Sequence, residues 1–468
     1  MSIPRRRFLR TSTRLLAAGA GLGLLQACRS AAPVPPAAAP TQATTASLAA
    51  DATRASQSVA SASPAPAATG GKVSFMAWGT PQAVADRKQF CVDFDRSHPG
   101  VECSFIYAPG KYMDKLLTMV AGGDAPDVFF ANATELPIMI SKSILHPLDD
   151  FIQQSKYDVS DFVPAALHQY QHAGKTYGLP RGFGMEAIFY NVDLFKKAGV
   201  PPVPTDWKAT GWDFAALAAA AQKLTTGSGA GRTFGYVIDP TNNREWMTYV
   251  WSNGGEIFNS DNSQCLLDQP PAVEALQFMQ DLIVTYHAAP TAAQMTEIGF
   301  IPMFDTGHVA MSISEPFTFA ERRKEAKFTW DVGIIPSGAK GRIPGGGGVG
   351  WALYNGVKYP NLAWDLLAEL AGPKFQLSEL KDGTTTPPRL SVLKSGAFLD
   401  TAQPPAHASI FVSEGALVRT DPQPVNWPEI NTALQNQLSY LWSGEHSAPE
   451  VARAIVADVN AILKKPVS

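Results

Sequence analysis

The stretch GKTYGLPRGFGMEAIFYNVDLFKKAGV, residues 174–200, holds the pattern around which the rest of the chain is organised. It opens with several glycines, continues through an apolar segment at residues 187–190 and ends in the amphipathic segment DLFKKAGV. Glycine adopts positive φ angles without steric penalty, so an extended glycine-rich piece before a strand and a short helix suits a chain that crosses between two lobes. An ordinary loop-strand-helix unit inside one domain has the same local pattern, so the stretch alone leaves both interpretations open.

The length and composition favour a chain that crosses between two lobes, because they indicate a globular protein too large for one hydrophobic core. The chain has 468 residues, 45% of them hydrophobic, and ten tryptophans. Chains of this length usually divide into two or more lobes or domains. The net charge is -3, only 17% of residues are charged, and the body of the chain has no basic stripe, which excludes the electrostatic footprint of a nucleic-acid-binding protein.

The first 28 residues have the features of an export signal. A basic segment at residues 5–10 precedes an apolar run at residues 15–25 that is too short and too glycine-rich to span a membrane. Residues 5–10 resemble the twin-arginine signal, and residues 25–28, LQAC, resemble the lipobox in which Cys28 becomes the lipidated N-terminus. We expect a signal peptide over residues 1–28 and a mature protein lipid-anchored to the outside of the cell membrane; a plain secretory signal is the alternative.

A tether is expected to follow the signal. Residues 29–71 consist mainly of Ala, Ser, Thr and Pro and contain no aromatic residue. Such a segment buries too little apolar surface to offset the entropy of ordering, so we expect it to be disordered.

Strands and helices are then expected to alternate. The hydrophobic pattern predicts strands at residues 72–78, 101–107 and 127–132 and helices at residues 84–94 and 112–120. This alternation favours an α/β fold with a parallel sheet, in which ligands bind beyond the carboxyl ends of the strands. Four residues fall at those ends: Trp78, Gly79, Thr80 and Asn132.

Short motifs in a fixed order carry a family resemblance over residues 72–463. They are AGGDAPDVFFAN at 121–132, LHPLDDFI at 145–152, GKTYGLP at 174–180, AIFYNVDLFKKAGV at 187–200, FDTGHVAM at 304–311 and PNLAW at 360–364. Each motif is weak alone, but the ordered set resembles the family 1 extracellular solute-binding proteins of bacterial ABC importers, the maltose-binding-protein-like group.

The resemblance implies a two-lobed periplasmic-binding-protein fold of class II, with a ligand cleft between lobes joined by about three hinge crossings. The crossings are expected at residues 182–188, at residues 345–350 and past Leu393. Lobe 1 would then comprise residues 72–185 and 349–393, and lobe 2 would comprise residues 186–348 and the helical C-terminal part, residues 394–468.

The resemblance also implies a sugar ligand, whose ring faces stack on aromatic side chains while its hydroxyls bond planar polar groups. The expected ligand-binding residues lie at element boundaries or crossings; they are Trp78, Gly79, Thr80, Asn132, Thr134, Phe183, Glu186, Trp246, Phe317, Gly347, Gly348, Arg389 and Trp427. For each tryptophan, core packing is the alternative. Phe317 stands where the family often has a tryptophan, and Arg389 would either hold a ligand oxygen or pair with a carboxylate.

Two further features leave alternatives open. The glycines at residues 345–350 contain GxGxxG, but the strand-like residues 351–354 follow instead of a helix, so we interpret them as hinge rather than dinucleotide-binding loop. Cys91 and Cys103 lie on an expected helix and strand that pack together in this type of lobe, where either a disulfide or two buried thiols would fit.

Catalysis has little support, since the chain has no GxSxG, HExxH or CxxC motif and the adjacent pair Asp149 and Asp150 does not face a shared site. We therefore expect a monomeric binding protein without cofactor or metal, which delivers a carbohydrate to the permease subunits of an ABC importer. One alternative keeps the fold and changes the ligand to glycerol phosphate, a polyamine, iron or a peptide. The other alternative is a lipid-anchored glycan-active enzyme.

Overall fold

The computed structural model describes residues 70–295, 299–381, 386–399, 402–413 and 418–465. The predicted signal, Cys28 and all but the last two residues of the predicted tether lie outside these described residues. Gly71, which the sequence assigned to the tether, is the first residue of strand β1. Within the described ranges, the search for membrane-spanning helices finds none with the necessary length and apolar character.

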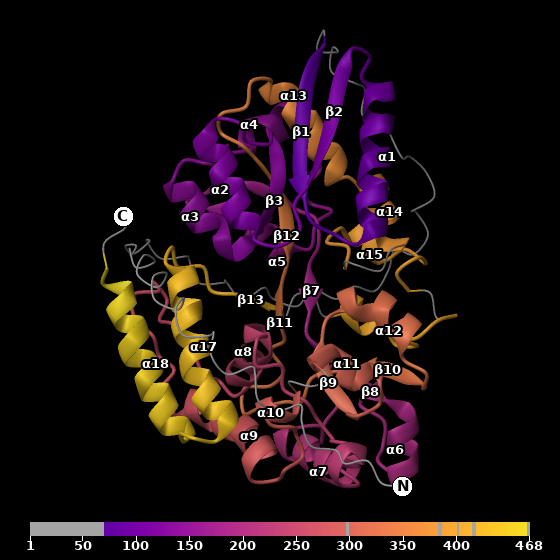
Figure 1. Ribbon diagram of the computed structural model, residues 1–468, viewed down its shortest axis with the longest axis vertical. Coiled ribbons are helices and arrows are strands. Elements are labelled where there is room, and N and C mark those ends of the chain that lie inside the picture. The colour runs from indigo at the N-terminus through magenta and orange to yellow at the C-terminus, as the bar shows by residue number, and fades with distance from the viewer. Residues whose placement is uncertain (1–69, 296–298, 382–385, 400–401, 414–417, 466–468) are drawn as a thin grey trace, which may run out of the picture.

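One half of the molecule, lobe 1, is built on a five-stranded mixed sheet in the order β2-β1-β3-β12-β6 (Figure 1). Its strands are β1 (Gly71–Ala77), β2 (Val101–Tyr107), β3 (Val128–Asn132), β12 (Val349–Leu353) and β6 (Gly178–Pro180). The three strands predicted from the hydrophobic pattern are parallel, with Phe75 opposite both Phe105 and Val128. The two later strands, β12 and β6, join antiparallel and make the sheet mixed.

Alternate strand residues of lobe 1 face two separate cores, as the two-residue period of a strand requires. Phe75 and Phe130 pack on one side with α1 (Pro81–Ser97) and α13 (Pro360–Leu370). Met76 and Phe129 pack on the other side with α2 (Tyr112–Gly122) and α3 (Leu136–Ser141). The remaining elements of this lobe are η1 (Ala133–Glu135), α4 (Asp149–Ser155), α5 (Pro164–His168), β4 (Gln171–His172), β5 (Lys175–Thr176), α14 (Pro373–Lys381) and α15 (Leu390–Leu393).

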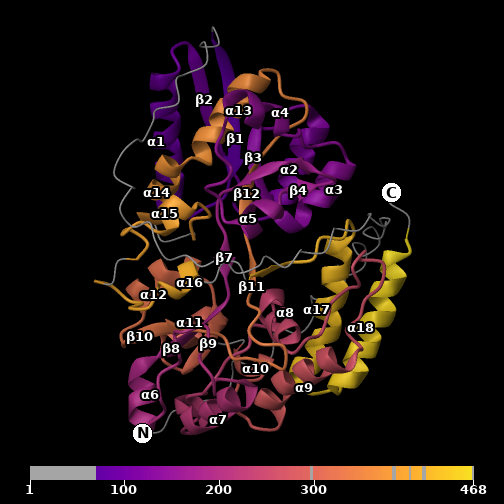
Figure 2. The same ribbon diagram turned by 180° about the vertical axis from the view of Figure 1, so that it is seen from behind.

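The other half, lobe 2, surrounds the antiparallel sheet β10-β8-β9, formed by Trp330–Gly333, Ala187–Asn191 and Met311–Ser314. One large core includes this sheet and most of the helices of lobe 2. The helices of lobe 2 are α6 (Val192–Ala198), α7 (Phe214–Leu224), η2 (Gly229–Gly231), α8 (Asn243–Ser252), α9 (Pro270–Val284), α10 (Ala292–Met295), α11 (Phe300–Asp305), η3 (Pro316–Thr318), α12 (Phe319–Glu325), α16 (Ile410–Ser413), α17 (Trp427–Ser443) and α18 (Ala448–Leu463). Figures 1 and 2 show α17 and α18 side by side along one flank.

A small sheet of three strands lies between the two halves (Figure 1). It consists of β7 (Gly184–Met185), β11 (Gly345–Gly347) and β13 (Arg419–Thr420). β11 is in the middle, antiparallel to β7 and parallel to β13. Two of the expected crossings therefore run as paired strands, and we call this three-stranded sheet the hinge sheet.

A buried ion triad ties the late helix α14 to the start of lobe 1. Glu379 accepts hydrogen bonds from Arg87 Nη2 at 2.7 Å and from Arg181 Nε and Nη2 at 2.8 Å each. Burial alone would raise the pKa of Glu379, but the two guanidiniums outweigh it and hold that pKa below its usual value. Arg87 also donates to the carbonyl oxygen of Trp78, so the triad fixes the chain where β1 ends.

The pairing of the cysteines, which the sequence left open, is a disulfide between Cys91 on α1 and Cys103 on β2. The bridge fastens the first helix to the edge strand of the sheet. Cys265 is a free, buried thiol in the core of lobe 2.

The ion triad makes a stability prediction. Glu379→Ala removes the carboxylate and leaves two buried positive charges facing each other, so it should lower the free energy of unfolding by about 3–5 kcal/mol. Glu102→Ala is the matched control, because Glu102 pairs with Lys72 on the surface and an exposed pair contributes about 1 kcal/mol at most. Urea unfolding of both variants measures the difference; equal losses would contradict a stabilising role for the triad.

Candidate functional site

A hollow of about 400 Å³ lies in lobe 1 where β1 and β3 end and α2 begins. Aromatic and polar side chains line it together: Trp78, Gly110, Lys111, Tyr112, Met113, Asp114, Asn132 and Glu135. Two of these, Trp78 and Asn132, were predicted from their position at the strand ends. We call this feature the aromatic hollow.

The aromatic side of the hollow is held rigidly. The indole of Trp78 packs edge-to-face against Tyr112, with ring centroids 4.6 Å apart, and against Phe130 at 4.9 Å. The Tyr112 hydroxyl donates to the carbonyl oxygen of Met76 at 3.0 Å, which fixes the ring on the sheet. Both rings remain partly exposed, so they offer a fixed apolar surface to a ligand.

The polar side of the hollow is a carboxyl held by an amide. Asn132 Nδ2 donates to Glu135 Oε2 at 2.9 Å. Burial raises the pKa of Glu135 above its usual value, although the bonds from Asn132 act in the opposite direction. An aromatic surface next to a positioned carboxyl and amide is the combination that binds the faces and hydroxyls of a sugar ring.

Three more predicted residues adjoin the hollow in the chain. Gly79 lies against the Arg87 guanidinium, where an added Cβ would be 2.5 Å from Nη1. Thr80 caps α1, since its Oγ1 accepts from the Ala83 amide at 3.2 Å. Thr134 lies in η1 and is partly exposed.

Glu186 lies fully buried between the hinge sheet and lobe 2. Its Oε1 accepts a hydrogen bond from Asn242 Nδ2 at 2.8 Å, and within the described residues its Oε2 has no hydrogen-bond partner. Burial and, next, the nearby Glu315 carboxylate raise the pKa of Glu186 to about 8. The side chain is therefore largely protonated near neutral pH.

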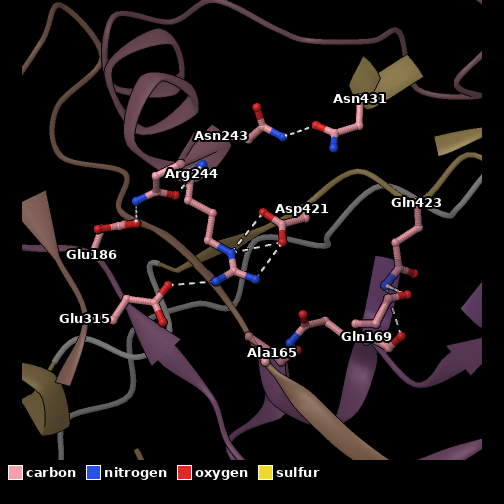
Figure 3. A network of polar contacts seen from close by, with 12 residues as sticks. Ala165, Gln169, Glu186, Asn243, Arg244, Glu315, Asp421, Gln423 and Asn431 are labelled. Carbon is pink, nitrogen blue, oxygen red and sulfur yellow. Dashed lines mark hydrogen bonds and ion pairs between the residues drawn. The ribbon is translucent and has the colours of Figure 1, made fainter. Parts of the chain in front are cut away.

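Next to Glu186, one guanidinium connects two carboxylates (Figure 3). Arg244 Nη1 donates to Glu315 Oε1 at 2.8 Å, while its Nε and Nη2 donate to Asp421 Oδ2 at 2.9 and 2.8 Å. The predicted residue Gly347 lies under the same guanidinium, and an added Cβ there would be 2.3 Å from Arg244 Nη2. Its neighbour Gly348 faces lobe 1 instead, where its carbonyl oxygen accepts from the Tyr170 hydroxyl at 3.2 Å.

The structure does not bring the other predicted residues to the hollow. Trp246 and Trp427 are buried in the core of lobe 2, as is Phe183, whose amide donates to the carbonyl of Thr386. Phe317 follows β9 and is 49% exposed.

Arg389 lies in lobe 1, buried among structural contacts. Its Nη1 bonds Asp161 at 3.1 Å, its Nε bonds the carbonyl oxygen of Ala371 at 2.8 Å, and its guanidinium stacks on Phe162. Of the two roles that the sequence left open for Arg389, the structure shows the pair with a carboxylate.

Sequence reasoning missed Tyr112 and the acidic residue Asp421. Tyr112 is the first residue of α2, the helix that follows β2. Ligands of such sheets bind beyond the carboxyl ends of the strands, so a search beyond the end of β2 would also have identified Tyr112. Asp421 meets Arg244 across 177 positions of the chain, and no local pattern signals that pair.

Comparison with known proteins places these features in context. A profile of the family described as bacterial extracellular solute-binding protein matches residues 75–377. A binding protein of Brucella abortus is 27% identical over 380 residues, covering 80% of this chain and 88% of its own. The arabinooligosaccharide-binding protein of Bacillus subtilis is 27% identical over 274 residues, covering 57% and 61%. The sn-glycerol-3-phosphate-binding periplasmic protein of Pectobacterium atrosepticum is 24% identical over 408 residues, covering 80% and 86%.

Solved structures share the fold. An ABC substrate-binding protein of Listeria monocytogenes in complex with cycloalternan aligns with a TM-score of 0.74 at 22% identity, covering 83% of this chain and 98% of that chain. The GacH receptor of Streptomyces glaucescens, solved without ligand and with acarbose, aligns with a TM-score of 0.72 at 24% identity, covering 85% and 99%. These likenesses confirm the predicted two-lobed α/β architecture.

The buried Glu186 predicts a pH dependence of stability. In the unfolded chain this carboxyl loses its proton near pH 4.5, whereas in the folded protein it keeps the proton up to about pH 8. The folded state therefore binds more protons across this window, and the stability contributed below pH 4.5 is lost as the pH rises towards 8, by about 1.4 kcal/mol for each tenfold difference in proton affinity.

Glu186→Gln removes this titration. Relative to the wild type, the variant should gain melting temperature between pH 5 and pH 8, measured by thermal unfolding without ligand. Glu102→Gln, a change at an exposed carboxyl in lobe 1, is the control. A constant difference between Glu186→Gln and the wild type would show that Glu186 is ionised in the folded protein.

Proposed function

Because the chain belongs to the bacterial extracellular solute-binding protein family, we propose that it captures a sugar or oligosaccharide between its lobes and delivers it to the membrane permease of an ABC importer. The aromatic hollow is the observation that carries the choice of ligand. Its rigid pair of rings beside a carboxyl and an amide offers what a sugar requires, a stacking surface and planar hydrogen-bonding groups.

The position of the hollow suits a ligand that contacts both lobes. The carbonyl oxygen of Ala133, next to Asn132, accepts a hydrogen bond from Gln423 at 2.8 Å, so the rim of the hollow touches the segment that leads from the hinge sheet to α17. A ligand in the hollow would favour the closed form in proportion to the contacts that it gains from lobe 2. In this proposal Glu186 and Phe317 are the candidates for those contacts, while Gly347 and Gly348 act through the backbone.

The same fold with an anionic ligand is the second candidate, because a relative is named for binding glycerol phosphate. A phosphate ester requires uncompensated positive charge. Three arginines that could serve this purpose are each paired with a carboxylate: Arg181 with Glu379, Arg244 with Glu315 and Asp421, and Arg389 with Asp161. The hollow adds Lys111 but also Asp114 and Glu135, so its charge favours a neutral ligand over an anion.

The cellular setting of this proposal comes from the N-terminal sequence. Cleavage before Cys28 and lipidation of that cysteine would anchor the protein to the outer face of the cell membrane, with residues 29–70 as tether. The tether would let the monomeric receptor reorient towards its permease. Export by a twin-arginine signal belongs to the same proposal.

A thermal-shift screen of the mature protein tests the ligand. The panel comprises mono- and oligosaccharides, sn-glycerol 3-phosphate, a polyamine and a short peptide, and ligand at a hundred times its Kd stabilises by about 2.7 kcal/mol. We expect a neutral saccharide to raise the melting temperature. A rise with glycerol phosphate, the polyamine or the peptide alone would replace the sugar by that ligand, and products formed from a glycan panel would indicate an enzyme.

The aromatic hollow predicts which residues bind that saccharide. Trp78→Ala and Tyr112→Ala should each weaken its binding roughly tenfold, because loss of a stacking aromatic costs on the order of 1.5 kcal/mol. Tyr286→Ala is the control, since Tyr286 is an exposed aromatic after α9 in lobe 2. Isothermal titration calorimetry measures the affinities; unchanged affinity in both hollow variants would exclude the hollow as the binding site.

A further inference from the structure

The guanidinium of Arg244 is linked to all three strands of the hinge sheet: it lies against β11, pairs with Asp421 next to β13, and reaches β7 through Glu315. Arg244 lies in the first turn of α8, in lobe 2, with its side chain 26% exposed. Figure 3 shows it extended between Glu315 on one side and Asp421 on the other.

The contact with β13 is a two-pronged ion pair. Asp421 directly follows the last residue of β13, Thr420, and its carboxylate bonds Arg244 Nε and Nη2. Such paired bonds fix the relative orientation of the two planar groups as well as their distance. The end of β13 is thereby fastened to α8.

The contact with β11 is steric. Gly347 is the last residue of β11, and the guanidinium lies so close to its Cα that an added Cβ would be 2.3 Å from Nη2. Only glycine permits this approach, because any side chain at this position would occupy the place of the guanidinium.

The contact with β7 passes through Glu315. One carboxylate oxygen accepts from Arg244 Nη1 at 2.8 Å. The other lies over Gly184, the first residue of β7, where an added Cβ would be 1.9 Å from Glu315 Oε2. The strand that carries the chain from lobe 1 into lobe 2 is thus packed against the carboxylate that Arg244 holds.

The segment after β13 continues the connection into lobe 1. Two residues beyond Asp421, Gln423 Nε2 donates to the carbonyl oxygens of Ala133 at 2.8 Å and Gln169 at 3.2 Å. On the other side of the strand, Arg419 pairs with Glu256 and stacks over Trp251 in lobe 2. The segment of residues 419–423 is therefore fastened to lobe 2 at one end and to lobe 1 at the other, with the Arg244 pair between them.

We propose that Arg244 is a positioning residue for lobe movement: it holds β7, β11 and β13 in one arrangement and so sets the distance between the lobes, without a role as a ligand contact. The link to affinity rests on the proposed function, whereas the effect on lobe distance does not. Loss of the guanidinium leaves the buried carboxylates of Glu315 and Asp421 uncompensated beside Glu186, and their repulsion separates the strands.

The distance between the lobes, measured by pulsed electron spin resonance, tests the proposal. Spin labels on Lys88→Cys in α1 and Lys324→Cys in α12 report on the two lobes, since both positions are exposed. In the described part of the chain the native cysteines are bridged, as Cys91 and Cys103 are, or buried, as Cys265 is. In Arg244→Met without ligand we expect a longer mean distance or a broader distribution than in the labelled parent. An unchanged distribution in the folded variant would overturn the proposal.

Two further variants separate a hinge effect from general damage. Gly347→Ala keeps every charge but displaces the guanidinium from β11, so it should change the lobe distance in the same direction as Arg244→Met. Arg342→Met is the matched control, because Arg342 bonds the carbonyl oxygens of Trp207, Trp212 and Ile335 within lobe 2. The control should lower stability with the lobe distance unchanged; a lengthened distance in the control, or none in Gly347→Ala, would overturn the proposal.

Affinity supplies the second readout. With the saccharide from the screen, Arg244→Met should weaken binding on the order of tenfold. If the lobe distance changes in Arg244→Met but no saccharide binds the wild type, the sugar assignment is rejected. The positioning role of Arg244 is then still supported. A changed distance with unchanged affinity would show that Arg244 sets the geometry of the lobes but not the equilibrium that ligand binding uses, which would overturn its role in capture.

Discussion

The close approach of backbone strands at the hinge sheet is the constraint on which the rest of this structure depends. Three short strands lie side by side at the junction of the two lobes, and each strand must satisfy its backbone groups there. The ladder of β11 with β7 and β13 meets that requirement, and glycines at residues 184 and 345–347 let side chains of lobe 2 lie directly on the strands. Arg244 and Glu315 pack against two of these glycines, and Asp421 pairs with Arg244, so several charged groups lie close together at the junction.

Much of this architecture was accessible from the sequence, because it follows from local periodicity and chain order. The parallel strands around Phe75 follow from that periodicity, and the crossing near Gly184 was expected from the ordered motifs. The antiparallel pairing of β12 was not predicted, since the sequence favoured a parallel sheet. The lobe boundaries and the individual ligand contacts stay predictions. The site was harder to derive because its geometry depends on pairs distant in sequence: nothing around Arg389 indicates Asp161, and nothing around Trp246 shows that its indole faces the core of lobe 2.

The two parts of the candidate site differ in their chemistry. The aromatic hollow is partly exposed and held in shape by ring packing and two hydrogen bonds, so it offers surface without large electrostatic cost. The hinge side is buried and has more carboxylates than cations, so at least one carboxyl is stable there only with its proton. A neutral ligand with many hydroxyls is compatible with both parts, whereas an anion would meet carboxylates in each.

The ion triad of lobe 1 has a consequence for the order of events during synthesis. Arg87 and Glu379 are 292 positions apart, and β12 enters the middle of a sheet whose other strands precede residue 181. Lobe 1, which begins to leave the ribosome first, therefore cannot complete its core until most of lobe 2 has been synthesised. Contacts of such separation form late and slowly. A chain that stops before β12 would therefore expose an unfinished sheet edge, and one that stops before Glu379 would leave Arg87 and Arg181 without that carboxylate.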